Sequence, residues 1–153
     1  MVAEKGEIFE VKKDWNRDYA TGAFIRYARL GCPTKEQYIN AIRHDVYKRL
    51  ETKEPKIILM RAEKEIENEK GAIEDISAIN KMFDMLAEGE KEYIIDAVKA
   101  VYLVPPHIRP KKKEIVMRVT AFAAERYVSE ATVYRWLKYA RELFSITRGL
   151  SID

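Results

Sequence analysis

The chain has 153 residues, of which 47% are hydrophobic and 35% are charged, and its net charge is +3. This composition is typical of a folded globular protein, and the length allows one domain or a small domain with an oligomerising segment. No apolar run approaches the roughly 20 residues that cross a bilayer, so we expect no membrane partner. The single cysteine, Cys32, excludes an internal disulfide and fits a reducing, cytoplasmic compartment. We expect it to be a buried, small apolar residue.

Charge is distributed unevenly along the chain. Residues 1–50 carry 10 Lys and Arg against 7 Asp and Glu, residues 51–104 carry 8 against 13, and residues 105–153 carry 10 against 5. A basic end beside an acidic middle is typical of a DNA-binding tail on a protein-contacting body. Solvated faces of mixed sign explain the same distribution equally well.

The sequence predicts helices throughout, after a flexible N-terminus over residues 1–13. The first helix has apolar residues spaced by three or four along one face and ends near Gly31: Trp15, Tyr19, Ala23, Tyr27 and Leu30. Thr34 and Gln37 have the spacing of a capping box, so a second helix begins there and Pro55 closes it or starts the next one. Its expected buried face consists of Ile39, Ile42, Val46 and Leu50.

A long, strongly charged helix is predicted from Lys56 to about Glu88, where Gly89 is a plausible stop. Two seams recur every seven residues in it: Leu59, Ile66, Ile73 and Asn80 form the first, and Ala62, Glu69, Ile76 and Phe83 form the second, with Glu69 out of place. The seams either pack on the chain's own helices or form a coiled coil with a second copy, in which a buried Asn fixes the register. A further amphipathic helix from Tyr93 to Tyr102 is terminated by two prolines.

Residues 121–136, AFAAERYVSEATVYRW, have the pattern of a helix-turn-helix. Ser129 is a good N-cap for a second, apolar-periodic helix. Ala123 supplies the small residue where two helices cross, and Val128 supplies the apolar residue of the turn. Val133 and Trp136 supply the inward positions four and seven residues after the N-cap. The alternative is an ordinary helical hairpin with an amphipathic second helix.

This motif predicts the residues that contact DNA. The start of the second helix and its outer face are expected to meet the DNA: Ser129, Glu130, Ala131, Thr132, Tyr134, Arg135 and Lys138. Arg135 is suited to reading a guanine, while Tyr134 and Lys138 hold the backbone. Lys111, Lys112 and Lys113 lead into the first helix, where cations oppose the helix dipole, so either phosphates neutralise them or they are simply solvated.

The residues Val128, Ser129, Thr132, Val133, Tyr134, Arg135 and Trp136 resemble the V-S-x-x-T-V-Y-R-W consensus of bacterial and phage helix-turn-helix regulators. Tyr127 stands where many such motifs place a glycine with a positive φ, and Arg126 stands where an apolar residue is usual. A different or longer turn is therefore expected.

A wider pattern over about residues 57–150 resembles the RinA/ArpU-type phage transcriptional regulators, which are similar to DNA-binding region four of sigma factors. It is carried by Glu90, Ile94, Ile95, Val98 and Tyr102 before the motif, and by Phe144, Gly149 and Leu150 after it. The resemblance implies control of late phage genes.

We therefore expect an all-α protein in which a helical N-terminal and central region precedes a C-terminal helix-turn-helix. Residues 14–104 form a helical body and the candidate oligomerisation region, and residues 105–153 form the DNA-binding region. The expected partners are double-stranded DNA, a second copy of the chain and RNA polymerase. The alternative function is that of a small terminase subunit in phage packaging, although such proteins usually place the motif at the N-terminal end.

No enzyme, cofactor or metal site is expected. The chain has no phosphate loop and none of the G-x-G-x-x-G, G-x-S-x-G or H-E-x-x-H patterns. His44 and His107 lack companion ligands at metal-binding spacing.

Overall fold

The computed structural model describes residues 17–150, and these residues form helices and no strand. The expected all-α class is therefore confirmed. A first helix, described over residues 17–29, is followed by α2 (Lys35–Arg49), α3 (Pro55–Asn68), α4 (Lys70–Glu88), α5 (Glu92–Tyr102), α6 (Lys112–Arg126) and α7 (Glu130–Arg148). The flexible N-terminus expected over residues 1–13 lies outside the described residues, as does Trp15.

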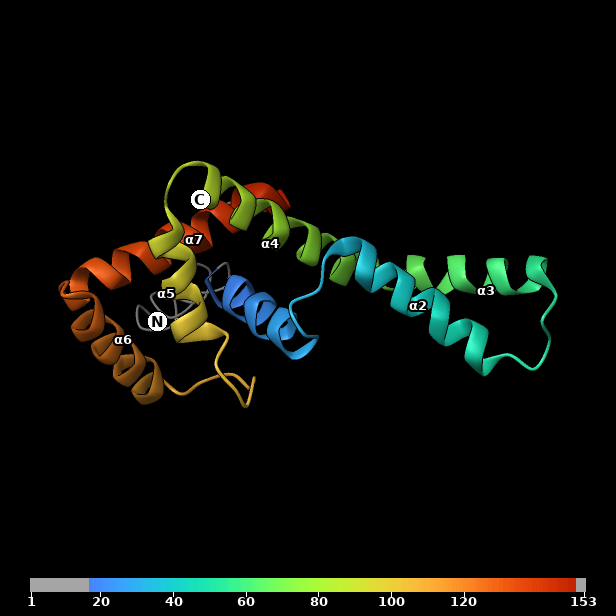
Figure 1. Ribbon diagram of the computed structural model, residues 1–153, viewed down its shortest axis with the longest axis horizontal. Helices are drawn as coiled ribbons and strands as arrows, with labels where there is room; N and C mark the ends of the chain where they lie inside the picture. The colour runs from blue at the N-terminus through green and yellow to red at the C-terminus, as the bar shows by residue number, and fades with distance from the viewer. Residues whose placement is uncertain (1–16, 151–153) are drawn as a thin grey trace, which may run out of the picture.

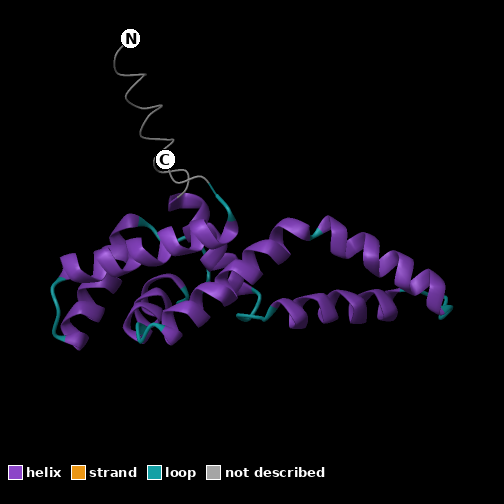
Figure 2. Cartoon of the chain, turned by 90° about the horizontal axis from the view of Figure 1, so that it is seen from above, coloured by secondary structure: helices purple, strands orange, loops and turns teal. Residues whose placement is uncertain are grey.

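The molecule is elongated, and its two helical hairpins lie at opposite ends (Figure 1). The hairpin of α2 and α3 projects at one end, whereas α6 and α7 meet at the other. The first helix, α4, α5 and most of α7 lie between them. A view from above shows the same arrangement (Figure 2).

The start of α2 has the predicted capping box. The Thr34 hydroxyl accepts from the Gln37 N–H at 3.1 Å, and the Gln37 side chain accepts from the Thr34 N–H at 2.9 Å. These two bonds satisfy backbone donors that a helix start otherwise leaves unpaired. The expected apolar face of α2 is only partly correct, because Val46 is its one buried residue. The other apolar residues of this face stay partly exposed in the projecting hairpin.

The first helix is the centre of the hydrophobic core. Most of its residues are buried: Ala20, Thr21, Ala23, Phe24, Ile25, Tyr27 and Ala28. The Phe24 ring packs against Tyr102 of α5 and Phe144 of α7, with ring centroids 5.8 and 5.5 Å apart. Buried aromatic residues contribute much of a core's stability. Because Leu137 and Ala140 of α7 belong to the same cluster, α7 shares one core with the helical body.

The long helix predicted from Lys56 to Glu88 is broken at Glu69, the residue that was out of place in its seam. α3 ends at Asn68 and α4 begins at Lys70. Beyond the break, Ile73 and Ile76 are buried against the chain's own helices. Leu59, before it, is 57% exposed. The sequence left two alternatives for the seams, packing within the chain or a coiled coil with a second copy. Ile73 and Ile76 pack within the chain.

The Asn80 side chain is hydrogen-bonded within the chain. Its side-chain oxygen accepts from the Lys35 N–H at 3.1 Å, and its amide donates to the Pro33 carbonyl at 3.2 Å. Both partners lie at the start of α2, so Asn80 fixes the position of the projecting hairpin on α4.

A buried carboxylate connects three parts of the chain. Asp75 of α4, only 6% exposed, accepts from the Tyr19 hydroxyl at 2.8 Å and from Arg148 Nε at 2.7 Å. Arg148 also pairs with Glu74 at 2.9 Å, and Arg26 approaches Asp75 at 3.5 Å. A buried charge is costly unless it is paired and hydrogen-bonded, and this network meets that need. It fastens the end of α7 to α4 and to the first helix.

Two further sequence predictions concern Cys32 and membranes. Cys32 is exposed and has a φ of 53°, so the expectation that it is buried is wrong. It lies in the tight turn after the first helix, where its N–H bonds to the Tyr27 carbonyl at 2.9 Å. None of the helices within residues 17–150 combines the length and the apolar character needed to cross a membrane.

Candidate nucleic-acid interface

α6 and α7 are joined by three residues, Tyr127, Val128 and Ser129. Tyr127 is left-handed, with φ 57° and ψ 40°. The Val128 N–H bonds to the Ala123 carbonyl at 3.0 Å, and the Tyr127 N–H bonds to Ala124 at 3.3 Å. This is the Schellman pattern, in which a residue of positive φ ends a helix. The expected longer turn is not found, because Tyr127 itself adopts the positive φ and three residues join the two helices.

The inward residues of the two helices lie as the pattern predicts. Ala123 is 3% exposed, and Val133 is fully buried. Val128 and Trp136 are partly buried and pack against the same core. The Trp136 ring lies 4.8 Å from Tyr93 and 6.5 Å from Phe122, centroid to centroid.

Ser129 is the N-cap of α7, as predicted. Its hydroxyl accepts from the Thr132 N–H at 3.1 Å and lies 2.9 Å from the Thr132 hydroxyl. Thr132 also accepts from the Arg135 guanidinium at 3.0 Å. Thr132 is partly buried, so this hydroxyl serves the helix start and orients Arg135.

The predicted contact residues on the outer side of α7 are exposed. Ala131, Arg135 and Lys138 lie on this side, and Tyr134 beside them is 40% exposed. Lys138 approaches Glu142, one turn further on, at 3.9 Å. Such exposed pairs contribute little to stability, so Lys138 remains available to an anionic partner.

Glu130 already has a partner inside the chain. Its carboxylate accepts from the Thr120 hydroxyl of α6 at 3.0 Å, and the same hydroxyl also lies 2.9 Å from the Val116 carbonyl. One hydroxyl has one proton to donate, so Thr120 divides it between the two acceptors. Glu130 is therefore part of the contact between α6 and α7 as well as an exposed acidic group.

The predicted lysines lie at the far end of α6 from the turn. Lys111 is the N-cap of α6, without a side-chain cap, and Lys112 and Lys113 are exposed in the first turn. A helix of this length spans roughly 20 Å. The structure nevertheless brings Lys112 and Tyr134 together, since both line one cleft.

That cleft has a volume of about 420 Å³ and contains cations that the sequence reasoning did not select. Its charged lining consists of Arg17, Asp18, Arg109, Lys112 and Arg141. Arg141 follows Tyr134 by seven residues, two helical turns, which places both on one side of α7. That spacing was a usable signal, whereas nothing in the sequence placed Arg109 beside α7.

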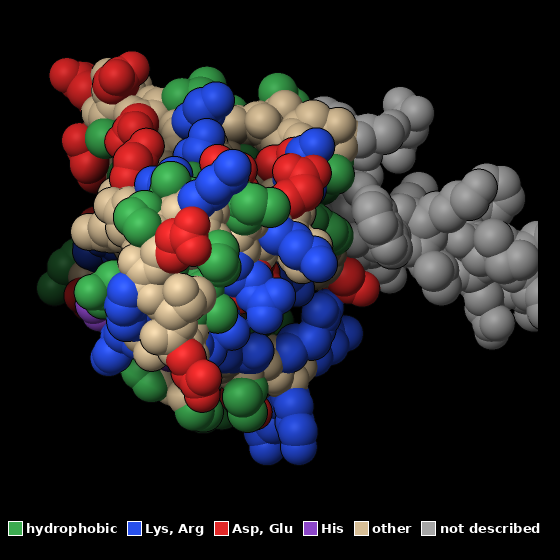
Figure 3. Space-filling view, turned by 90° about the vertical axis from the view of Figure 1, so that its right-hand side faces the viewer, with side chains coloured by type: hydrophobic (Ala, Val, Ile, Leu, Met, Phe, Trp, Pro, Cys, Tyr) green, Lys and Arg blue, Asp and Glu red, His purple; other side chains and the backbone are tan. Residues whose placement is uncertain are grey.

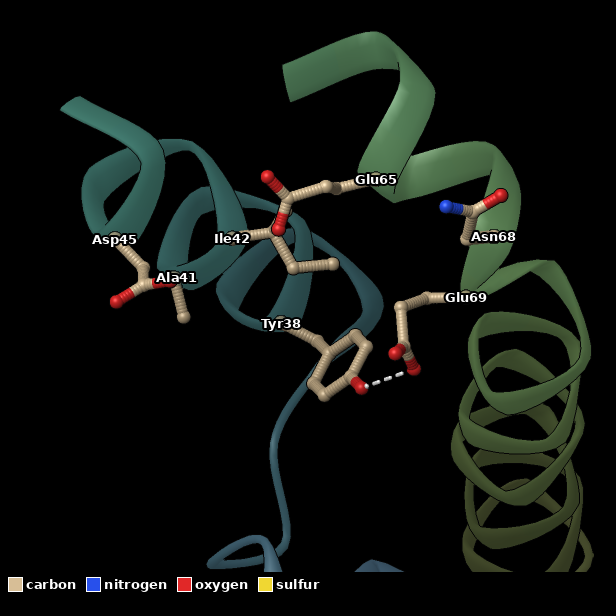
Figure 4. Close-up of a pocket in the computed structure, with 7 residues that line it drawn as sticks. All are labelled: Tyr38, Ala41, Ile42, Asp45, Glu65, Asn68 and Glu69. Atoms are coloured by element: carbon tan, nitrogen blue, oxygen red, sulfur yellow. Dashed lines mark hydrogen bonds between the residues drawn. The ribbon is translucent and has the colours of Figure 1, made fainter. Parts of the chain in front are cut away.

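A second pocket, of about 360 Å³, lies between α2 and α3 (Figure 4). Carboxylates of Asp45, Glu65 and Glu69 line it, and the Tyr38 hydroxyl donates to Glu69 at 2.9 Å. Burial and then the Glu69 carboxylate raise the pKa of Tyr38 to about 12. Arg49 bridges Asp45 and Glu65 at 2.7 and 2.6 Å. These pairings make the pocket part of the hairpin's own packing.

The surface at the α2–α3 end carries both signs of charge. Viewed from that end, Asp and Glu lie mostly above, while Lys and Arg gather toward the lower right (Figure 3).

Among residues 17–150, no group of three or more His, Cys, Asp or Glu side chains is placed to hold a metal ion. Comparisons of the chain with protein-family models, with curated proteins and with solved structures find no match.

Proposed function

We propose that this protein is a sequence-specific DNA-binding protein and that α6 and α7 act as its helix-turn-helix. One observation carries the proposal. α7 begins at a capped Ser129 after a three-residue turn, and its first turns bury Val133 while they expose Ala131 and Arg135. This division is the one that a recognition helix needs to enter the major groove with its N-terminal residues on the base edges.

The positive charge at the start of α6 supports the same placement of α6 and α7 on a duplex. The exposed Lys111, Lys112 and Lys113 lie at the N-terminal end of α6, and in a helix-turn-helix the first helix crosses the phosphate backbone. Phosphate contacts of this kind fix the protein's register on the duplex, while base contacts carry the sequence information.

Within this arrangement Arg135 reads a base and its neighbours hold the backbone. The Arg guanidinium matches the O6 and N7 acceptors of guanine. Among residues 17–150, Arg135 bonds only to the Thr132 hydroxyl, at 3.0 Å. Tyr134 and Lys138 lie on either side of it along the exposed part of α7. Glu130 and Thr132 contribute less to base reading than the sequence pattern predicted, since both are hydrogen-bonded within the chain.

The biological role that we propose is phage-type transcriptional regulation by a homodimer. One recognition helix reads few base pairs, and symmetric dimers read two half-sites. The resemblance of residues 57–150 to RinA/ArpU-type regulators supports this role, with RNA polymerase as a further partner.

The test begins with a binding site selected from random duplexes, and fluorescence anisotropy then measures affinity for that site and for a scrambled duplex. Arg135→Ala should weaken binding to the selected site by about 1–3 kcal/mol and relax the preference at one base pair. Joint replacement of Lys111, Lys112 and Lys113 by Gln should weaken both duplexes about equally and flatten the salt dependence, because fewer counterions are released. Lys64→Gln, an exposed change in α3, is the control. If Arg135→Ala stays folded and discriminates fully, α7 is not the reading helix.

A further inference from the structure

The cleft beside Tyr134 combines groups from four separate parts of the chain. The first helix, α5, the segment before α6 together with α6 itself, and α7 all contribute to its lining. Its volume of about 420 Å³ lies within the roughly 300–1,000 Å³ range of small-ligand sites. Four cations and one carboxylate line it, and that carboxylate, Asp18, pairs with Arg109 at 2.7 Å. Lys112 and Arg141 therefore bring positive charge that Asp18 does not offset.

Arg141 is the central observation. It is partly buried, and its Nη1 donates to the hydroxyl of Tyr102, itself only 5% exposed, at 2.7 Å. Among residues 17–150, no carboxylate forms an ion pair with Arg141 or with Lys112. A partly buried guanidinium is stabilised by an anion. Within the described part of the chain, the bond to Tyr102 uses one of the five N–H donors of Arg141.

We propose that this cleft binds a phosphate group, with Arg141 and Lys112 as its principal ligands. The Tyr102 hydroxyl holds the guanidinium in place, and a guanidinium held in this way matches two phosphate oxygens with parallel N–H donors. Lys112 adds a mobile point charge from the first turn of α6, and the Tyr134 side chain forms another wall. A phosphate in a DNA backbone and a phosphate on a small metabolite present the same chemistry to these groups.

The duplex backbone is the source that the surroundings favour, and this assignment rests on the proposed function. Tyr134 lines the cleft and also belongs to the exposed side of α7 that we assign to the DNA. A phosphate held at Arg141 would set the depth and angle at which α7 enters the groove. The cleft would then supply register, in the way that backbone contacts do, from a residue outside the recognised motif.

The experiment titrates the full chain with inorganic phosphate in place of chloride at constant ionic strength, followed by NMR of backbone amides and arginine side chains. We expect one saturable set of shifts centred on Lys112, Tyr134 and Arg141. Arg141→Met and Lys112→Gln should each weaken phosphate binding roughly 10-fold or more, since each removes a charge-assisted contact. Lys64→Gln should leave it unchanged. Lys112→Gln keeps the test decisive if Arg141→Met is unstable, because Lys112 is exposed at the surface.

A second arm adds a duplex to the phosphate-bound protein. Displacement of phosphate by the duplex supports the backbone as the source, whereas simultaneous binding of both supports a small phosphorylated ligand. Phosphate binding in the cleft without any duplex binding overturns the proposed function and keeps the phosphate site. Equal phosphate affinity in the wild type and in both cleft variants, or shifts scattered over unrelated lysines, overturns the site itself.

Discussion

Replacing Tyr127 by glycine should stabilise the protein. Tyr127 has a φ of 57°, a backbone conformation that costs an L-residue roughly 1–2 kcal/mol. Tyr127 is 96% exposed, so truncation of its side chain removes almost no buried surface. Glycine also has greater conformational freedom in the unfolded chain, and this lowers the free energy of unfolding by about 0.4–1 kcal/mol. It offsets part of the gain from the relieved backbone strain. The net stabilisation should be about 0.5–1 kcal/mol.

Urea unfolding followed by circular dichroism measures this difference, and Tyr127→Ala is the matched control. Alanine removes the same side chain but keeps the strained φ, so its stability should stay within about 0.5 kcal/mol of the wild type. In thermal melts, a gain of 1 kcal/mol corresponds to about 2–4 °C for a domain of this size. A glycine variant no more stable than the alanine variant would refute the assignment of backbone strain to this turn.

Three further predictions concern the core and the hairpin. Asp75→Asn should lower the free energy of unfolding by about 2 kcal/mol, because it removes the buried carboxylate that binds Arg148 Nε and leaves Arg148 with Glu74 as its remaining acidic partner; an unchanged urea midpoint would contradict this. Tyr38→Phe should remove one phenol of pKa about 12 from an alkaline absorbance titration. The fold raises the pKa of Tyr38 above its ordinary value of 10, so the protonated Tyr38 hydroxyl contributes fully to the free energy of unfolding below pH 10, and this contribution is lost as the pH rises through 12. The loss of stability at alkaline pH should therefore be smaller in Tyr38→Phe. Trp136→Ala should cost about 2 kcal/mol in chemical unfolding, less than the 3–5 kcal/mol of a fully buried Trp, since Trp136 keeps some exposure; a larger loss would mean that the motif depends wholly on this ring.

Local signals in the sequence predicted the helix ends well. Thr34 with Gln37, and Ser129, carry their capping information in a few neighbouring side chains, and both caps are present in the structure. The outward and inward sides of α7 were also predictable, because a period of 3.6 residues assigns Val133 and Arg135 to different sides.

Features that depend on tertiary contacts were not predictable in the same way. Glu69 interrupts one seam, but the apolar spacing resumes after it, and a single polar residue does not distinguish a break from a continuous helix. The break between α3 and α4 leaves Glu69 beside the Tyr38 hydroxyl. Arg141 was overlooked because its significance comes from Tyr102, 39 positions earlier in the chain. The positive φ of Tyr127 went against its residue type, since only the surrounding hydrogen bonds enforce it.

The central position of the first helix has a consequence for synthesis. Phe24 packs against Phe144, about 120 residues later, and at about 5–20 residues per second the ribosome needs roughly 6–24 s to make the intervening chain. During that time the apolar sides of the first helix lack their final partner, and contacts of such long sequence separation form slowly. The core around the first helix therefore cannot be completed until α7 has been made and docks. The helix that carries the proposed base-reading residue, Arg135, is thus also the last wall of the core around the first helix.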